Sequence, residues 1–384
     1  MEYIPDILLY LFIFVASATL IYHGVKLSDA KKKTGLLFIT LGIVIPSIMA
    51  GIRYNVGVDF TAYMKMFHNV EVGQPMYFRS IEPLSTLIIT LSANLHNSFL
   101  MFFSFSLITN ICFFLAFWRF LKKDPKQTAF AFFFYLCILF PTSLNAIRSS
   151  VAISMIALIF SYLLQKWSKR TIAASIILLI VATLFHKSAL LILLFIPVLW
   201  FAKLYPESKF KTRKMTLFII YFSIAALAPL IYLISKNILP LGDYSRYLAK
   251  FGNEFSIPLA NIIMSIPIFY TIFYLFKNKK AKKDKQIDEI LYCAIFYIPL
   301  SIMVGWLAYA KGLSRISFVL EPFIILLMVH LITLPPKTAK IWRVSATICV
   351  VIVVSLMFIR NLNWSKALPY QTIFEKEISH ATEN

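Results

Sequence analysis

Apolar runs of membrane-spanning length recur from one end of the chain to the other, and each is stopped by Lys, Arg, Asn or Pro. A helix needs roughly 20 apolar residues to cross the hydrocarbon of a bilayer. Backbone polar groups in lipid must pair within the protein, and these runs are too long for the strands of a membrane barrel. The composition agrees, because 60% of the 384 residues are hydrophobic and only 14% are charged. The sequence therefore predicts an all-α polytopic membrane protein.

The runs predict twelve transmembrane helices, at approximately residues 4–22, 34–51, 98–118, 128–143, 148–165, 171–186, 188–201, 215–235, 256–276, 288–308, 316–333 and 343–360. Residues 81–96 are also apolar but carry Ser, Thr and Asn. Counting them as a full span would move the basic loops that follow to the other side of the membrane. We therefore expect a re-entrant or interfacial helix there, although a full span paired with a second half-span would also fit.

Basic residues mark one side of the membrane. The connections at 26–33, 119–126, 166–170, 203–214, 277–285 and 337–343 hold 25 of the 38 Lys and Arg residues. They alternate along the chain, so all six lie on one side, which the positive-inside rule makes the cytoplasm. This distribution explains the net charge of +21 without nucleic acid. It also predicts a cell-membrane protein whose termini, loop 52–97 and tail 361–384 are extracytoplasmic.

No internal repeat and no Gly/Ser-rich linker divides the chain, so residues 1–384 are expected to form a single membrane domain. The first apolar run has Glu2 and Asp6 near its start and its basic residues after it. A cleavable signal peptide has its basic region in front, which predicts a retained first helix. The four cysteines lie within apolar runs at no metal-ligand spacing, so we expect packing residues rather than a disulfide or a zinc site.

A polar stretch, Gly51-Ile-Arg-Tyr-Asn-Val-Gly-Val-Asp-Phe-Thr-Ala-Tyr63, follows the second apolar run. It places Arg53, Asp59, Tyr54 and Tyr63 at the outer end of a span, in a chain that is otherwise lipid-like. The two Tyr rings are candidates to stack on sugars, but an aromatic belt at the membrane interface explains them about as well.

Further polar residues lie at the outer ends of distant spans, and the predicted topology brings them to one depth on one side. They are Arg53, Asn145, Arg148, His186, Arg246 and Arg315. Arg is permanently cationic, and its planar fork of donors suits phosphate oxygens. Interfacial anchoring explains any one of them, whereas several together suit a lipid-linked diphosphate.

Three side chains are candidates for proton transfer. His186 is either a helix cap or a general base, since the ordinary pKa of His lies near working pH. Asp59 either activates an attacking sugar hydroxyl or holds an Arg through a buried pair. Glu82, before Pro83, is a further carboxylate, expected on the substrate side.

Several classes of enzyme are disfavoured by missing motifs. The sequence has no Walker motif, no Gly-rich dinucleotide loop, no His-Glu-x-x-His and no nucleophile elbow. It has no acidic loop of the Asp-x-Asp type on the outer side either. We therefore expect no cofactor and no metal, with cationic side chains acting on a donor that is already in the membrane.

The polar stretch resembles the hallmark of EpsG-type exopolysaccharide polymerases, which are relatives of the Wzy O-antigen polymerases. Other stretches are similar to that family as well: Ile81-Glu-Pro-Leu84, Asn145-Ala-Ile-Arg-Ser-Ser-Val-Ala152, Ala182-Thr-Leu-Phe-His-Lys-Ser-Ala-Leu190, Arg315-Ile-Ser-Phe318 and Leu368-Pro-Tyr-Gln-Thr-Ile-Phe374. Val58 and Ser149 depart from it, because Thr and Gln are usual there.

The resemblance implies a glycosyltransferase on a scaffold akin to the GT-C enzymes, which polymerises repeat units of exopolysaccharide, capsule or O-antigen on undecaprenyl diphosphate. His186, Asp59, Arg148 and Arg315 would be catalytic, and Arg53, Tyr54, Tyr63, Glu82, Asn145 and Arg246 would bind substrate. The partners would be the lipid-linked donor and acceptor, membrane lipids, a chain-length regulator and a flippase. A flippase of lipid-linked oligosaccharide and a membrane acyltransferase that modifies the glycan are the alternatives.

Overall fold

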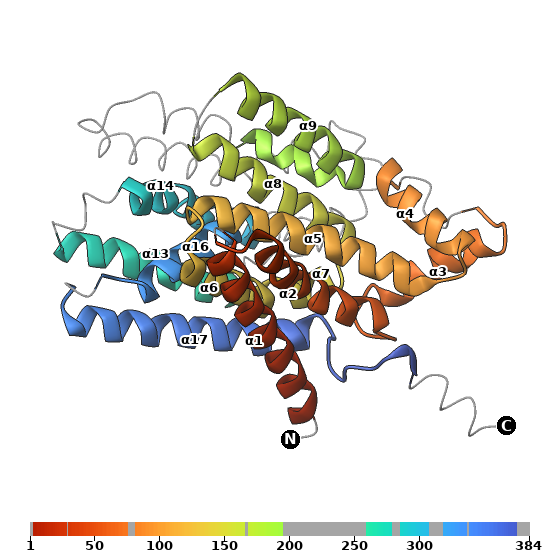
Figure 1. Ribbon diagram of the computed structural model, residues 1–384, viewed down its shortest axis with the longest axis horizontal. Helices are drawn as coiled ribbons and strands as arrows, with labels where there is room; N and C mark the ends of the chain where they lie inside the picture. Colours follow the sequence, from red (N-terminus) through yellow and green to blue (C-terminus); the bar gives the residue numbers. More distant parts are fainter. Residues whose placement is uncertain are drawn as a thin grey trace. The chain divides into compact units, whose positions relative to one another are not determined.

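The computed structural model describes residues 3–28, 30–75, 81–165, 168–194, 259–278, 285–306, 318–335 and 338–374 (Figure 1). Within these ranges the regular structure is helical, apart from an isolated antiparallel bridge between Arg53 and Thr372. The chain divides into two compact units, one of residues 1–190 and 354–384 and one of residues 191–353.

Six of the described helices are long and apolar enough to cross a membrane: α1 (Ile4–Leu27), α2 (Lys32–Ile52), α5 (Ser98–Phe120), α8 (Ile147–Gln165, spanning to Leu164), α13 (Leu259–Lys277) and α17 (Lys340–Trp364). Many carry large apolar side chains on their surface, such as Phe12, which is 72% exposed, and Phe276, which is 70% exposed. Such exposure suits a lipid environment. These features confirm a polytopic helical membrane protein.

In the first unit, α5 is central because it packs against α2, α4, α6 and α8. This unit also contains α3 (Phe60–Glu71), α4 (Pro83–Asn94), α6 (Pro125–Ile138), α7 (Phe140–Ser143), α9 (Lys169–Phe185) and the later part of α17. The 3-10 helix η1 (Lys187–Leu194) follows α9 and begins in this unit. Helices α1 and α2 approach closely, since an added Cβ at Gly24 would meet Ile39 at 2.7 Å. Close approach through small residues is common between membrane helices.

The second unit contains α13, α14 (Lys285–Ala294), α15 (Tyr297–Trp306) and α16 (Glu321–Ile332), together with the first part of α17. Helix α16 packs against α13 and α14 and is buried along most of its length. The Tyr270 hydroxyl of α13 meets the Ser345 hydroxyl of α17 at 2.6 Å.

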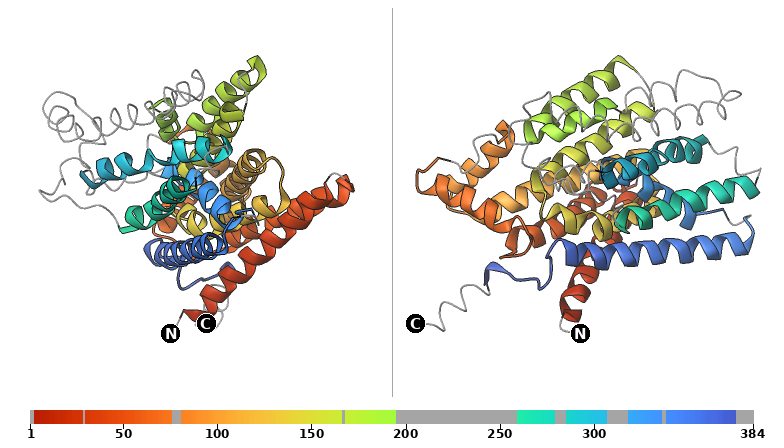
Figure 2. Two further views of the ribbon diagram at one scale, coloured as in Figure 1. Left: turned by 90° about the vertical axis from the view of Figure 1, so that its left-hand side faces the viewer. Right: turned by 180° about the vertical axis from the view of Figure 1, so that it is seen from behind.

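The apolar stretch at 81–96 forms the twelve-residue helix α4, which α5 follows after a short turn. At about 1.5 Å rise per residue, this helix is too short to cross the hydrocarbon by itself. Helices α3 and α4 pack together at the N-terminal end of α5, and both Figure 1 and the rear view in Figure 2 show them there. The geometry supports the re-entrant or interfacial alternative.

Two predicted spans are interrupted, each at a proline. The run 128–143 is α6 and the short α7, with Pro141 in the first turn of α7. The run 288–308 is α14 and α15, with Pro299 near the start of α15. A proline ring clashes with the carbonyl four residues earlier, which favours a break there, although α2 and α13 continue through Pro46 and Pro267. The predicted span 215–235 lies outside the described residues.

Candidate functional site

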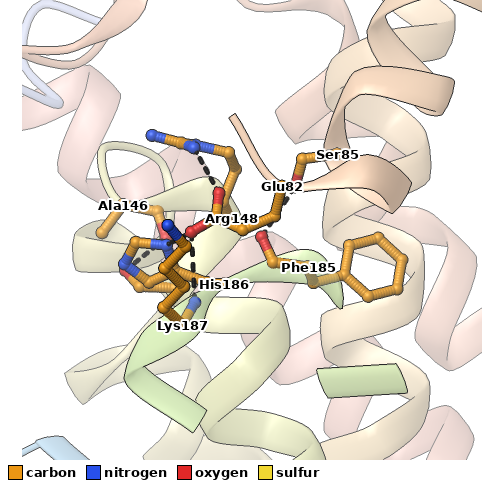
Figure 3. Close-up of polar contacts among 8 residues, drawn as sticks. Glu82, Ser85, Ala146, Arg148, Phe185, His186 and Lys187 are labelled. Atoms are coloured by element: carbon orange, nitrogen blue, oxygen red, sulfur yellow. Dashed lines mark hydrogen bonds and ion pairs between the residues drawn. The ribbon is translucent and has the colours of Figure 1, made fainter. Parts of the chain in front are cut away.

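Three polar residues that are distant in the sequence meet around one carboxylate (Figure 3). Glu82 Oε2 accepts a hydrogen bond from Arg148 Nη1 at 2.7 Å. Glu82 Oε1 lies 2.8 Å from His186 Nδ1 and accepts the backbone N–H of Lys187 at 3.1 Å. We call Glu82, Arg148 and His186 the Glu82 cluster.

Each member of the cluster stands at the end of a helix. Glu82 is the N-cap residue of α4 and is followed by Pro83, which suits the first turn of a helix. Arg148 lies in the first turn of α8, and His186 is the C-cap residue of α9, where the backbone becomes extended. The backbone groups at helix ends have no partner within the helix, so they and the side chains near them can bind groups from other helices.

Ser85 fixes α4 to the end of α9. It lies three residues after Glu82, and therefore on the same face of the helix. Its hydroxyl donates to the carbonyl of Phe185 at 2.8 Å, which satisfies a helix-end carbonyl next to His186. Ser85 is not among the residues predicted from the sequence, where its only signal is the spacing from Glu82.

The charges of the cluster are mutually stabilising. Burial alone would raise the pKa of the Glu82 carboxyl, but the hydrogen bonds from His186 and the Lys187 backbone outweigh it and lower that pKa to about 2. Arg148 lies at the N-terminus of α8, where the helix dipole disfavours a cation. The negative charge of Glu82 compensates for this unfavourable position of the Arg148 cation.

Exposure differs sharply within the cluster. The Glu82 side chain is 5% exposed, whereas those of Arg148 and His186 are 20% and 28% exposed. Arg148 Nε is buried without a hydrogen-bond partner among the described residues, as is the Ser188 hydroxyl. Buried donors are normally paired, so this arrangement leaves capacity for an anionic or hydroxylic ligand.

A second group forms around Arg53, whose side chain is buried on the ring of Phe102, with Cζ 4.4 Å from the ring centroid. Arg53 Nη1 donates to the carbonyl of Leu144, and Asn145 Oδ1 accepts the backbone N–H of Val58 at 2.7 Å. These contacts tie residues 53–58 to the turn that precedes α8. We call Arg53, Gly57, Leu144 and Asn145 the Arg53 brace.

The segment after α17 covers the brace. The backbone N–H of Tyr54 donates to the Gln371 carbonyl at 2.8 Å, and that of Gly57 donates to the Lys366 carbonyl at 2.9 Å. The Tyr370 hydroxyl donates to the Met49 carbonyl at 2.6 Å. The stretch Leu368–Phe374 therefore helps to hold residues 49–54 in place.

Other predicted residues lie between these groups. Tyr63 is 5% exposed and interacts electrostatically with both Arg53 and Arg148. Burial lowers the pKa of Arg53 to about 10, and nearby groups that include Asp59 oppose this shift, so Arg53 stays cationic at neutral pH. Asp59 and Tyr54 are half-buried. Arg246 and Arg315 lie outside the described residues, so their part in the site stays a prediction.

The geometry favours a supporting role for Arg53 and Asn145, which sequence reasoning had placed among substrate-binding residues. Arg53 is 1% exposed and Asn145 is 4% exposed. Both are engaged with backbone groups of the brace. Arg148 and His186, in contrast, keep part of their surface open.

One more carboxylate gathers two histidines. Glu71 lies 3.1 Å from His68 Nδ1 and 3.0 Å from His96 Nδ1, and both histidines are largely exposed. Across the described ranges, no three His, Cys, Asp or Glu residues are grouped so as to hold a metal ion. The Glu71 group serves below as a matched comparison for Glu82.

The family model of the EpsG family matches residues 36–372, which includes every residue of the Glu82 cluster and of the Arg53 brace. No curated protein and no solved structure matches the chain. The resemblance found in the motifs is thereby confirmed over most of the sequence.

Proposed function

Because the chain belongs to the EpsG family, we propose that it is a membrane exopolysaccharide polymerase that joins oligosaccharide repeat units on the extracytoplasmic face. The donor is a growing glycan on undecaprenyl diphosphate, and the acceptor is a second lipid-linked repeat unit. The product is an exopolysaccharide, a capsule or an O-antigen.

One observation carries the proposal. A cation that suits a diphosphate, Arg148, and a group that can take a proton, His186, are joined through Glu82 at adjoining helix ends. Both side chains remain partly open, and Arg148 Nε has no partner among the described residues. A glycosyl transfer from a lipid diphosphate needs these two groups near each other.

The proposed reaction is a displacement at the anomeric carbon of the donor. The acceptor hydroxyl oxygen forms a bond to that carbon while the bond from the carbon to the diphosphate oxygen breaks. His186 takes the proton of the hydroxyl, and the lipid diphosphate departs with the bonding electrons. Arg148 stabilises the charge that develops on the diphosphate, and Arg315 is expected to assist.

The remaining parts of the proposal concern architecture. The chain has twelve spans on a single GT-C-like membrane domain, with both termini and the Glu82 cluster on the extracytoplasmic side. The alternation of basic connections along the sequence supports this orientation. Asp59, Tyr54 and Arg246 complete the substrate-facing set.

Glycan length in a host that lacks the protein tests the function. Wild type should restore long chains, and Arg148→Ala should leave single lipid-linked repeat units despite normal membrane insertion. Arg119→Ala is the control, because Arg119 binds Ser161 near the other end of the paired helices α5 and α8. That variant should restore long chains.

Two results would overturn the function. Repeat units that accumulate on the cytoplasmic leaflet of the knockout would indicate a flippase. Long chains of normal length that lack a substituent would indicate an acyltransferase or another modifying enzyme.

A further inference from the structure

The two oxygens of Glu82 serve different partners. Oε1 faces His186 Nδ1 and the backbone N–H of Lys187, while Oε2 faces Arg148. The carboxylate is almost fully enclosed, so it does not offer itself to a substrate. We propose that Glu82 is the positioning residue of this site, which holds His186 in the tautomer that leaves Nε2 free to accept a proton. This inference rests on the proposed function.

The tautomer follows from the hydrogen bonds. An ionised carboxylate only accepts, so the ring nitrogen that faces it must carry a hydrogen. His186 Nδ1 is that nitrogen, at 2.8 Å from Oε1. In a neutral imidazole the other nitrogen, Nε2, then bears the lone pair. Glu82 thus makes His186 a base at one defined atom.

The same carboxylate also sets the spacing between the base and the cation. Arg148 on α8 and His186 after α9 each bind one oxygen of Glu82, whose α4 is pinned to Phe185 by Ser85. Tyr63 from α3 also interacts with Arg148, and the backbone N–H of Lys187 donates to Glu82 Oε1. A change at Glu82 therefore disturbs the positions of both His186 and Arg148.

Glu82→Gln tests the positioning role. A glutamine side chain has the same size but offers one accepting oxygen, so its amide NH₂ must face either His186 or Arg148, both of which donate. In a reconstituted assay that joins lipid-linked repeat units, we expect kcat to fall at least about tenfold, with KM changed by less than about twofold, because the ground-state contacts to substrate remain.

Glu71→Gln is the matched control. Glu71 also accepts Nδ1 of two histidines, yet the Glu71 group lies on the exposed surface, apart from the Glu82 cluster. Its kcat should stay within about twofold of wild type. Equal losses in the two variants would mean that any carboxylate–histidine pair of this region acts through stability, and the positioning role would be wrong.

A double variant distinguishes positioning from a merely structural effect. Because Glu82 acts through His186 and also holds Arg148, Glu82→Gln should cost less in the His186→Ala background than it costs in wild type. Losses that multiply would overturn the inference. If Glu82→Gln fails to fold, Glu82→Asp replaces it in the test, because it keeps the charge with a shorter side chain. Glu82→Asp should fold and have a kcat between those of wild type and His186→Ala. A wild-type kcat in Glu82→Asp would contradict the positioning role.

The assay also separates the inference from the function on which it rests. Wild-type protein that joins no repeat units would refute the polymerase. A different pattern would refute only the positioning role of Glu82: wild type is active, Arg148→Ala is inactive, and Glu82→Gln keeps the full kcat.

Discussion

Gly57 is the backbone position on which the Arg53 brace depends most directly. Its φ of +104° is a conformation that residues with a side chain rarely adopt. A Cβ built at Gly57 would lie 2.7 Å from Asn145 Oδ1 and 3.3 Å from Arg53 Nη1. The change Gly57→Ala therefore combines backbone strain with a collision inside the brace.

A second glycine, Gly73, helps to separate the backbone strain from the collision with Asn145. A non-glycine residue at such a φ costs about 1–3 kcal/mol. Displacing the Asn145 amide also breaks its hydrogen bond with the Val58 N–H, which is worth about 1 kcal/mol more. Gly73 has a φ of +72° but nothing within 4 Å of an added Cβ, so Gly73→Ala carries strain without a collision. We expect Gly57→Ala to lower the free energy of unfolding by about 2–4 kcal/mol and Gly73→Ala by about 1 kcal/mol.

Reversible unfolding of the full chain in mixed micelles measures both free energies under the same conditions. The difference between the variants reports the contact of Gly57 with Asn145 together with any extra strain at the larger φ of Gly57. Equal losses in the two variants would show that the close approach contributes nothing, and the account of the brace would be refuted. An unchanged Gly57→Ala variant would refute the assigned backbone conformation as well.

Two further predictions follow from the charged groups. The pKa of Glu82 is about 2 in the folded protein against an ordinary value of 4.5, so its carboxylate contributes stability above pH 4.5 that is lost as the pH falls towards 2. The free energy of unfolding should decrease by about 3 kcal/mol across that window, and Glu82→Gln should abolish most of this decrease. An unaltered pH dependence in the variant would contradict the lowered pKa of Glu82. Arg53→Lys should lower the free energy of unfolding by about 1–3 kcal/mol, because lysine has no planar group to lie on Phe102 while donating to Leu144, and stability equal to wild type would show that charge alone suffices.

The hydropathy of the sequence predicted several of the long helices to within two residues at each end. The run predicted at 98–118 is the helix Ser98–Phe120, and that at 171–186 is Lys169–Phe185. The runs predicted at 128–143 and 288–308 are each divided into two helices, with Pro141 and Pro299 near the start of the second helix. Proline alone did not predict these breaks, because Pro46 and Pro267 lie inside the continuous helices α2 and α13.

The sequence singled out Glu82, Arg148 and His186, but it did not predict the contacts among them. The predicted topology places Arg148 and His186 on one side of the membrane. The structure joins them through Glu82, which is 66 residues from one and 104 from the other. No spacing rule reports such a pairing. The burial of Arg53 was also hidden, because it depends on the Phe102 ring and the Leu144 carbonyl, which a sequence pattern does not reveal.

The segment that covers the Arg53 brace has a consequence for biogenesis. Tyr370 and Met49, which it joins, are 321 residues apart in the chain. A ribosome therefore delivers α2 long before the residues that cover the Arg53 brace, and Arg53 is without that cover in the nascent chain until the segment after α17 has been translated. The Arg53 brace can be completed only after that point.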